Sequence, residues 1–315
     1  MQRVRKQLGL TDLVPGRLRG APVTAAVLDS GVSLHPDLEG AVIAFRDFTG
    51  YADRNKPEKR DMVPYDQYGH GTHVCGILGG NGKISGGRFG GIFPGMKLVV
   101  GKVLDERGEG SMEEMQEGLE WILSVRKQYE IRLLNISVGI SNLREVEKQK
   151  RLLEVLGQFS KQGILVICAA GNSGPGENSL SALGEAGGAV SVGCHDGVFF
   201  RNDPGRCAMF SGRGAKGSRI RKPDVVAPGT GIISCSGLYR RGMPARSAYQ
   251  KRSGTSMAAA IVTGCLARTL QRNPDLTPEE LKRILISTAA DLGEDHSLQG
   301  YGMVNPRGMI LRAGN

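Results

Sequence analysis

The sequence has no apolar run long enough to cross a membrane, since no stretch of 18 residues is free of polar side chains. The first ten residues, "MQRVRKQLGL", are polar and basic, and they lack the apolar segment of a secretory signal. We therefore expect a cytoplasmic protein without a membrane partner. Secretion of a processed form stays open.

The cysteines lack the spacing of a metal or redox site. Six of them stand at positions 75, 168, 194, 207, 235 and 265, and no two form a CxxC pair. Cys168 lies within the apolar stretch "ILVICAA". This pattern favours buried free thiols in a reducing compartment, with disulfides in an exported chain as the alternative.

Acidic residues are scarce in one segment. The 315 residues include 41 Lys and Arg and 31 Asp and Glu, and residues 199–252 contain twelve basic but only two acidic side chains. Aromatic residues make up 5% of the chain, and no nucleic-acid-binding motif accompanies the basic segment, so we expect no nucleic-acid partner. The segment indicates a solvated basic surface or an electrostatic preference for acidic substrates.

Short apolar runs alternate with helical patterns along the chain. The runs that resemble buried strands cover residues 23–29, 97–104, 131–138, 163–170 and 189–194. Helices are predicted from Ser111, where Glu114 completes a capping box, over residues 143–161, and from Thr277 with Pro278 in its first turn. This alternation predicts an α/β fold, a three-layer, doubly wound, mostly parallel sheet with helices on both faces.

The chain shows no long linker. We divide it into an N-terminal arm, residues 1–20, and a single domain, residues 21–315, and we expect residues 236–252 to form an exposed loop. In such a fold the active groups lie at the carboxyl ends of the strands.

Four polar residues stand at predicted strand ends or helix starts. Asp29 ends the first strand in "AVLDSG", and His70 lies between glycines in "GHGTHVCG". Asn172 follows the strand "ILVICAA", and Ser256 precedes the run "MAAAIVTG". Each has a plain structural explanation, such as turn formation for Asp29. Together they supply the groups of nucleophilic catalysis.

A second histidine, His73, lies on a helix predicted to run from Thr72. Zinc proteases use two histidines four residues apart with a glutamate between them, and this sequence has neither feature. We therefore expect no metal here, and interpret His73 as a packed, hydrogen-bonded side chain.

The segments "AVLDSG", "GHGTHV", "AAGN" and "SGTSMAA" resemble, in this order, the four signature blocks of the subtilisin-like serine proteases (subtilases, peptidase family S8). The resemblance covers about residues 21–310 and is strongest to leaderless intracellular members. It implies a serine endopeptidase of broad specificity, in which Asp29, His70 and Ser256 form the triad and an acyl-enzyme forms on Ser256. Asn172 would supply the oxyanion hole. The alternative is a catalytically weak or inactive scaffold that acts as a binding protein.

The resemblance also implies where a peptide or protein substrate binds. The substrate would form an added strand between two walls, and its P1 side chain would enter beside residues 169–172. The residues expected to contact it are Gly108, Gly110, Ser137, Val138, Gly139, Ala169, Ala170 and Gly171. Because Arg252 lies near the expected primed side, acidic residues are favoured there. The oligomeric state is left open.

The sequence departs from the family pattern in two places that bear on chemistry. Ala260 stands four residues after Ser256, where the family usually has proline, and we expect slower hydrolysis as a result. Many secreted relatives have a calcium-binding loop at the position of residues 81–90, and Asp37 matches one of its ligands. This loop has no carboxylate, so we expect no calcium there and no cofactor in catalysis.

Overall fold

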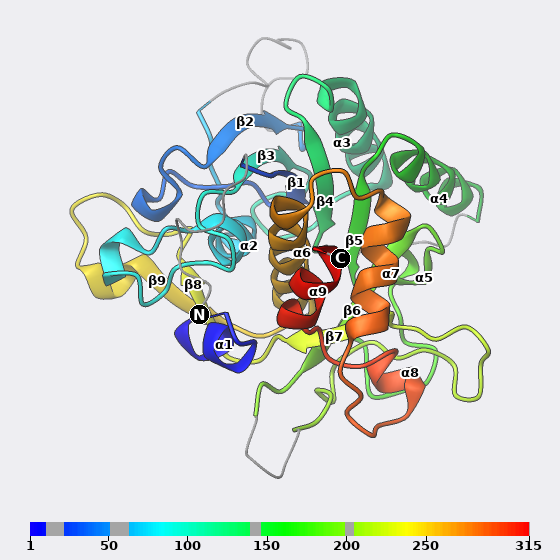
Figure 1. The fold of residues 1–315 in the computed structure, drawn as a ribbon. Coiled ribbons are helices and arrows are strands. Elements are labelled where there is room, and N and C mark those ends of the chain that lie inside the picture. Colours follow the sequence, from blue (N-terminus) through cyan, green and yellow to red (C-terminus); the bar gives the residue numbers. More distant parts are fainter. Residues whose placement is uncertain (11–21, 51–62, 139–145, 199–204, 315) are drawn as a thin grey trace.

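The structure, a computed structural model, describes residues 1–10, 22–50, 63–138, 146–198 and 205–314. Seven parallel strands form one sheet in the order β2-β3-β1-β4-β5-β6-β7 (Figure 1). Their bounds are β1 Thr24–Asp29, β2 Val42–Asp47, β3 Lys97–Lys102, β4 Ile131–Ile136, β5 Leu165–Ala169, β6 Ala189–His195 and β7 Val225–Pro228.

The five predicted strands are confirmed, whereas β2 and β7 were not predicted. Strand β2 is at the edge of the sheet. Its sequence VIAFRD has only four apolar residues before Arg46 and Asp47, and Phe45 and Asp47 are its buried residues. Strand β7 has only four residues and ends in Pro228.

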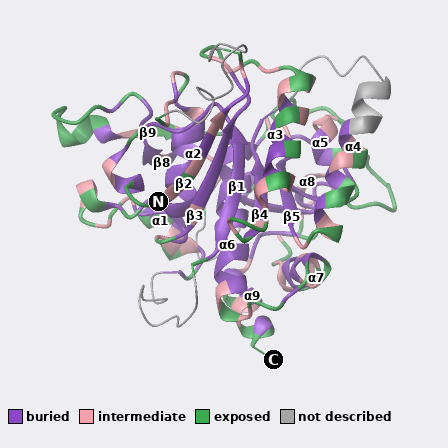
Figure 2. Cartoon of the chain, turned by 90° about the horizontal axis from the view of Figure 1, so that it is seen from above, coloured by how far each residue is buried: buried purple, intermediate pink, exposed green. Residues whose placement is uncertain are grey.

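The two faces of the sheet belong to separate apolar clusters, as the alternation of a strand requires. Ala25 and Val27 of β1 lie in the cluster that includes α2 (His70–Gly79) and α6 (Thr255–Arg272). Ala26 and Leu28 lie in the cluster of α3 (Met112–Val125) and α4 (Val146–Lys161). Figure 2 shows the buried sheet between the helices, which confirms the α/β fold. By the same alternation, Asp29 faces α2 and α6.

Helix α6 lies on the sheet among the remaining helices of its face (Figure 1). Its contacts include β4, β5, β6 and β7, and it runs unbroken through Ala260, which is fully buried. The other helices are α1 Gln2–Gln7, α5 Ala182–Glu185, α7 Pro278–Thr288, α8 His296–Gln299 and α9 Pro306–Ala313. None of the helices in the described ranges has the length and apolar character to span a bilayer.

The capping box predicted at Ser111 is present, and the helix predicted from Thr277 also begins with one. Ser111 and Glu114 bond reciprocally at α3, and Thr277 and Glu280 do so at α7. The prediction that a helix begins at Thr72 is wrong by two residues, because Gly69 takes a left-handed conformation (φ 78°) and the helix starts at His70. Of the helix expected over 143–161, residues 143–145 lie outside the described ranges.

The expectation of an exposed loop over residues 236–252 is wrong at both ends, since Ser236 and Tyr239 are buried near its start. Residues 240–247 are exposed, but β9 (Tyr249–Arg252) pairs antiparallel with β8 (Ile232–Cys235). Ala248 is fully buried. The hairpin was missed because β9, "YQKR", is polar and only partly buried.

The first ten residues pack against the body of the molecule. Val4, Leu8 and Leu10 are buried in the apolar cluster of α2 and α6. All six cysteines are buried and free, as the sequence predicted.

Candidate active site

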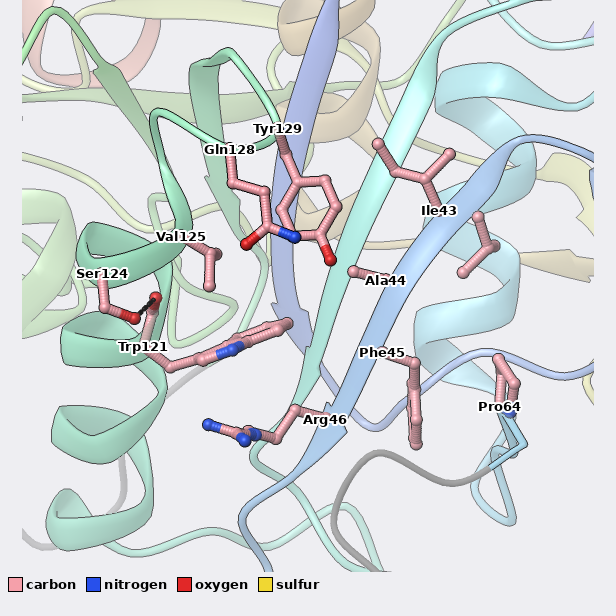
Figure 3. A pocket seen from close by; sticks show the side chains of 11 residues that line it. Ile43, Ala44, Phe45, Arg46, Pro64, Trp121, Ser124, Val125, Gln128 and Tyr129 are labelled. Atoms are coloured by element: carbon pink, nitrogen blue, oxygen red, sulfur yellow. Dashed lines mark hydrogen bonds between the residues drawn. The ribbon is translucent and has the colours of Figure 1, made fainter. Parts of the chain in front are cut away.

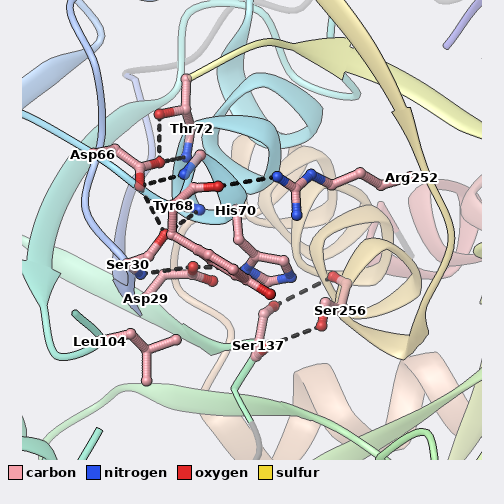
Figure 4. A network of polar contacts seen from close by, with 12 residues as sticks. Asp29, Ser30, Asp66, Tyr68, His70, Thr72, Leu104, Ser137, Arg252 and Ser256 are labelled. Atoms are coloured by element: carbon pink, nitrogen blue, oxygen red, sulfur yellow. Dashed lines mark hydrogen bonds and ion pairs between the residues drawn. The ribbon is translucent and has the colours of Figure 1, made fainter. Parts of the chain in front are cut away.

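The carboxylate of Asp29 and the imidazole of His70 are hydrogen-bonded. Asp29 ends β1 and is fully buried. His70 is the first residue of α2, and its Nδ1 lies 2.7 Å from Oδ1 of Asp29. The backbone amide of Ser30 donates to the same oxygen, also at 2.7 Å. This contact orients the imidazole and leaves its Nε2 edge for another partner (Figure 4).

Asp66, which the sequence analysis missed, connects the segments that carry these two residues (Figure 4). Its Oδ1 accepts from the Ser30 hydroxyl at 2.9 Å and from the Gly69 amide at 2.7 Å. Its Oδ2 accepts from the amide and the hydroxyl of Thr72 at 2.8 and 2.6 Å. A buried carboxylate with four donors fixes the end of β1 against the start of α2. In the sequence, its position four residues before His70 was the only indication that Asp66 belongs to the site.

Lys102, at the end of β3, is a second buried charge that the sequence analysis missed. Its Nζ donates to the carbonyl oxygens of Ser30 and Leu104 at 2.8 and 2.5 Å. Burial lowers the pKa of Lys102, and the nearby carboxylates of Asp66 and Asp47 oppose that effect. The ammonium group therefore holds the chain where it leaves β1 and β3.

The pKa of His70 is raised above its ordinary value. Burial alone would lower this pKa, but the charge and hydrogen bond of Asp29 outweigh it. Asp66 adds to the rise, and the guanidinium of Arg252 acts against it. The site therefore stabilises an imidazolium at this position.

Ser256 is the second residue of α6, directly after Thr255. Its side chain lies on the far side of the His70 imidazole from Asp29 (Figure 4), and its hydroxyl donates to the carbonyl oxygen of Ser137 at 2.8 Å. A backbone N–H in the first turn of a helix has no intrahelical acceptor, and the helix dipole adds partial positive charge there. The Ser256 amide is therefore placed to bind an anion.

Asn172 lies beside the start of α6. Its Oδ1 accepts from the amide of Thr255 at 3.0 Å and from the Thr255 hydroxyl at 3.1 Å. The residue is exposed. Because the side-chain oxygen is bound to the helix start, the amide nitrogen is the group that points away from it, as a hydrogen-bond donor.

Those of the residues expected to contact substrate that the structure describes lie at or after the ends of strands β3, β4 and β5. Ser137 and Val138 follow β4 and are buried, whereas Gly139 lies outside the described residues. Ala169 and Ala170 are buried at the end of β5, and the Gly171 amide donates to the Thr255 hydroxyl at 3.2 Å. Gly110 has no space for a side chain, since a Cβ there would lie 2.3 Å from the carbonyl oxygen of Val103. Gly108, in the same loop, lies against Tyr68.

His73 makes the contacts of a packed side chain. It is fully buried, and its Nε2 lies 3.1 Å from the Ile232 carbonyl oxygen and 3.2 Å from that of Gln250. Burial lowers the pKa of His73 to about 3, so the ring is neutral.

One cluster in the described residues has the composition of a metal site. His35, Asp37 and Cys235 place ligand atoms within 4.8 Å of one another. The polar atoms already have partners, however. His35 Nε2 contacts the Ala248 carbonyl oxygen, and its Nδ1 accepts from the Asp37 amide. The carboxylate oxygens of Asp37 accept from Ile84 and Tyr249.

The loop over residues 81–90 is held by protein groups. The Ile84 amide donates to Oδ1 of Asp37 at 2.9 Å, and the Asn81 amide donates to the Asp37 carbonyl oxygen at 2.8 Å. From α1, the Arg5 guanidinium donates to the Gly87 carbonyl oxygen at 2.8 Å. The Ile84 contact occupies Oδ1 of Asp37, the residue that the resemblance matches to a calcium ligand.

A separate pocket of about 580 Å³ lies between β2 and α3 (Figure 3). Trp121 and Tyr129 of the α3 side and Phe45 of β2 are among its lining residues, and the Arg46 guanidinium lies 5.7 Å from the centre of the Trp121 ring. The pocket contains none of the candidate site residues.

A carboxylate bonded to an imidazole, with a serine at a nearby helix start, is the set of groups that serine hydrolases use on several unrelated folds. Residues 20–304 match the family model described as the subtilase family, so the chain belongs to that family of subtilisin-like serine proteases. It is 35% identical to serine protease AprX of Bacillus subtilis (strain 168) over 305 residues, covering 93% of this chain and 67% of AprX.

Two further similar proteins support the same family assignment. An intracellular serine protease of Paenibacillus polymyxa is 31% identical over 300 residues, which are 91% of this chain and 79% of that protein. Among solved structures, Sphericase matches with a TM-score of 0.78 and 25% identity, over 96% of this chain and 97% of that one. The chain is thus an enzyme of the serine protease class.

Proposed function

We propose that this protein is an endopeptidase that cleaves peptide bonds through an acyl-enzyme on Ser256. The hydrogen bond between Asp29 and His70, with Ser256 on the other side of the ring, is the observation that carries the proposal. His70 Nε2 takes the proton of the Ser256 hydroxyl as its oxygen attacks the carbonyl carbon. The same nitrogen then returns the proton to the leaving amine.

The Ser256 hydroxyl must turn before it can react. In the free enzyme it donates to the Ser137 carbonyl oxygen. Catalytic hydrogen bonds often form only when substrate is bound. A substrate strand that pairs with the 137–139 segment brings its carbonyl to Ser256, whose hydroxyl rotates towards His70.

The developing oxyanion binds between the Asn172 amide nitrogen and the Ser256 backbone N–H. The bonds from Thr255 to Asn172 Oδ1 support this assignment, because they fix the orientation of the amide. Preorganised donors of this kind are worth roughly 3–4 kcal/mol of the barrier.

Main-chain pairing with two walls, Gly108–Gly110 and Ser137–Gly139, suits substrates of many sequences. The P1 side chain enters beside residues 169–172. On the primed side, Arg252 is half-buried next to Tyr68 and Gly69, and its positive charge favours Asp or Glu in the substrate.

No cofactor takes part, and the 81–90 loop needs no calcium because Asp37 and Arg5 hold it.

We place this activity in the cytoplasm. Six buried free thiols suit a reducing compartment. A relative that is 31% identical is named an intracellular serine protease.

The test is hydrolysis of casein and of peptide p-nitroanilides by the purified chain and by the variants Ser256→Ala, His70→Ala and Asp29→Asn. We expect the first two variants to lose at least about 10⁴-fold in kcat and Asp29→Asn about 10⁴-fold, since the asparagine favours the wrong imidazole tautomer. Unchanged rates in all three would assign the activity to other residues. A folded wild type without any turnover would favour a binding scaffold.

A further inference from the structure

Strand β2 has an open edge, away from the site of Ser256. It is the last strand on one side of the sheet, and among the described strands it pairs only with β3. The amide of Phe48, just after β2, donates to the Lys102 carbonyl oxygen of β3 at 2.8 Å. By the alternation of a strand, the N–H and C=O groups of Phe45 therefore point away from β3. An edge of this kind is a template for a further strand.

Two pockets adjoin this edge. The first is the pocket of about 580 Å³ between β2 and α3, where Trp121 and Tyr129 face the strand (Figure 3). The second, of about 630 Å³, is lined by the chain that leads into β2 and by the 240–241 segment. Its lining includes Leu34, Leu38, Val42, Pro64, Arg240 and Arg241. Val42 and Pro64 line both pockets, so the two hollows meet at the start of β2.

The second pocket combines apolar side chains with positive charge. Leu34 is 69% exposed, which is unusual for a large apolar side chain at a pocket. Arg240 and Arg241 are exposed, and Nη1 of Arg240 is fixed by the carbonyl oxygens of Gly237 and Tyr239, each at 2.9 Å. Glu39, the acidic residue of the lining, lies 3.5 Å from the Lys83 ammonium. This pocket is suited to an apolar side chain that lies next to a carboxylate.

We infer that the edge of β2 binds an extended, acidic segment of a partner protein as an added strand. Main-chain pairing with β2 supplies affinity, and pockets for alternate side chains supply specificity. Because successive side chains of a strand point to opposite faces, one apolar side chain enters the pocket of Trp121 and the next enters the pocket of Leu34. Carboxylates of the segment then lie against Arg240 and Arg241. This docking site is separate from the proposed catalytic residues and does not depend on their activity.

The shape and charge of the edge favour such a segment over a second copy of this chain. The register of β2 against β3 shifts between Val42 and Ala44, and an irregularity of this kind disfavours long pairing between two edge strands. A two-fold pairing would also bring Arg240 and Arg241 of both chains to one seam, where like charges repel.

The experiment measures binding of the fluorescein-labelled peptide Thr-Glu-Phe-Leu-Glu-Val-Thr to the full chain by fluorescence anisotropy. The host is the Ser256→Ala variant, so binding needs no turnover and its result is independent of the proposed function. We expect saturable binding that Arg240→Glu/Arg241→Glu and Leu34→Asp each weaken at least about tenfold. Lysines in place of the peptide's glutamates should have the same effect. Of two peptides N-methylated at alternate amides, the one whose methyl groups face β2 should fail to bind, while the other should bind.

Arg219→Glu/Arg221→Glu is the matched control, because it reverses two exposed charges outside both pockets, and it should leave the affinity unchanged. The inference would be overturned if the peptide does not bind, if the control variant weakens binding equally, or if both N-methylated peptides bind alike. Competitive inhibition of p-nitroanilide cleavage by the peptide would place it in the active site instead. A dimer in analytical ultracentrifugation that Ile43→Asp dissociates would assign the edge to a second copy and would also overturn the inference.

Discussion

Asp66 accepts two hydrogen bonds from Thr72, one from the amide at 2.8 Å and one from the hydroxyl at 2.6 Å. Its other oxygen accepts from the hydroxyl of Ser30, the neighbour of Asp29. The two segments that carry the carboxylate and the imidazole are thus joined twice, once by the Asp29–His70 bond and once behind it by Asp66.

We expect Asp66→Ala to lower the free energy of unfolding by about 1–3 kcal/mol, because it leaves buried donors without an acceptor. Asp66→Asn should cost less, since the amide keeps one acceptor oxygen. The pH profile separates a positioning role from a purely structural one. Asp66 raises the pKa of His70, so both variants should move the acidic limb of kcat/KM to lower pH. A loss of stability with an unchanged limb would leave Asp66 with a structural role only.

Arg252 should have the opposite effect on the same limb. Its positive charge lowers the pKa of His70, and the base is active only when it is neutral. Removing the charge in Arg252→Gln raises that pKa, so the acidic limb of kcat/KM moves to higher pH. The shift should be larger at 20 mM than at 500 mM salt, because the residue is partly exposed. A limb that stays in place at low salt would contradict this account of the charge.

The proposed role of Asn172 as an oxyanion donor and its contact with the start of α6 can be separated by two substitutions. Asn172→Asp keeps an oxygen that accepts from Thr255, but it removes the amide donor and adds a negative charge near the oxyanion. Asn172→Ala removes both contacts. Both should lower kcat by about 10²–10³-fold with KM changed only a few-fold, and only Asn172→Ala should also weaken the start of α6. A large rise in KM at constant kcat would place Asn172 in substrate binding instead.

The buried Asp224 predicts an acid-sensitive part of the stability. Burial raises its pKa, but Lys222 at 2.6 Å and Lys282 at 3.3 Å lower it more, so the folded value lies below 3.8. A depressed carboxyl pKa stabilises the fold above the unfolded pKa, and this contribution is lost as pH falls through the folded value.

Asp224→Asn should therefore be less stable than wild type at pH 7, by about 3–5 kcal/mol, since it leaves the Lys222 ammonium buried without its partner. The difference should shrink as pH falls below about 4. Urea unfolding at pH 7, 4 and 3 measures it. A difference that does not depend on pH would mean that the ion pair does not titrate in this range.

Five strands of the main sheet and the starts of α3 and α7 could be predicted because their signals are local. Apolar runs such as 163–170 and the Thr277–Glu280 box need no information from elsewhere in the chain. Strand β9 could not be predicted, because its polar residues are ordered by pairing with β8. The bond between Asp29 and His70 joins residues 41 positions apart, and only the resemblance related them. Asp66 and Lys102 stayed hidden because buried charges follow from tertiary packing, which composition does not show.

The central claim is that His70 activates the hydroxyl of Ser256. A fluorophosphonate probe tests it most directly, because the probe forms a bond only with a serine oxygen that a base activates. Mass spectrometry of the intact and digested protein should find one adduct, on the peptide that contains Ser256. No adduct should form in Ser256→Ala, and labelling of His70→Ala should be slower by several orders of magnitude. Equal labelling of wild type and Ser256→Ala, or a folded wild type that takes up no probe, would contradict the claim.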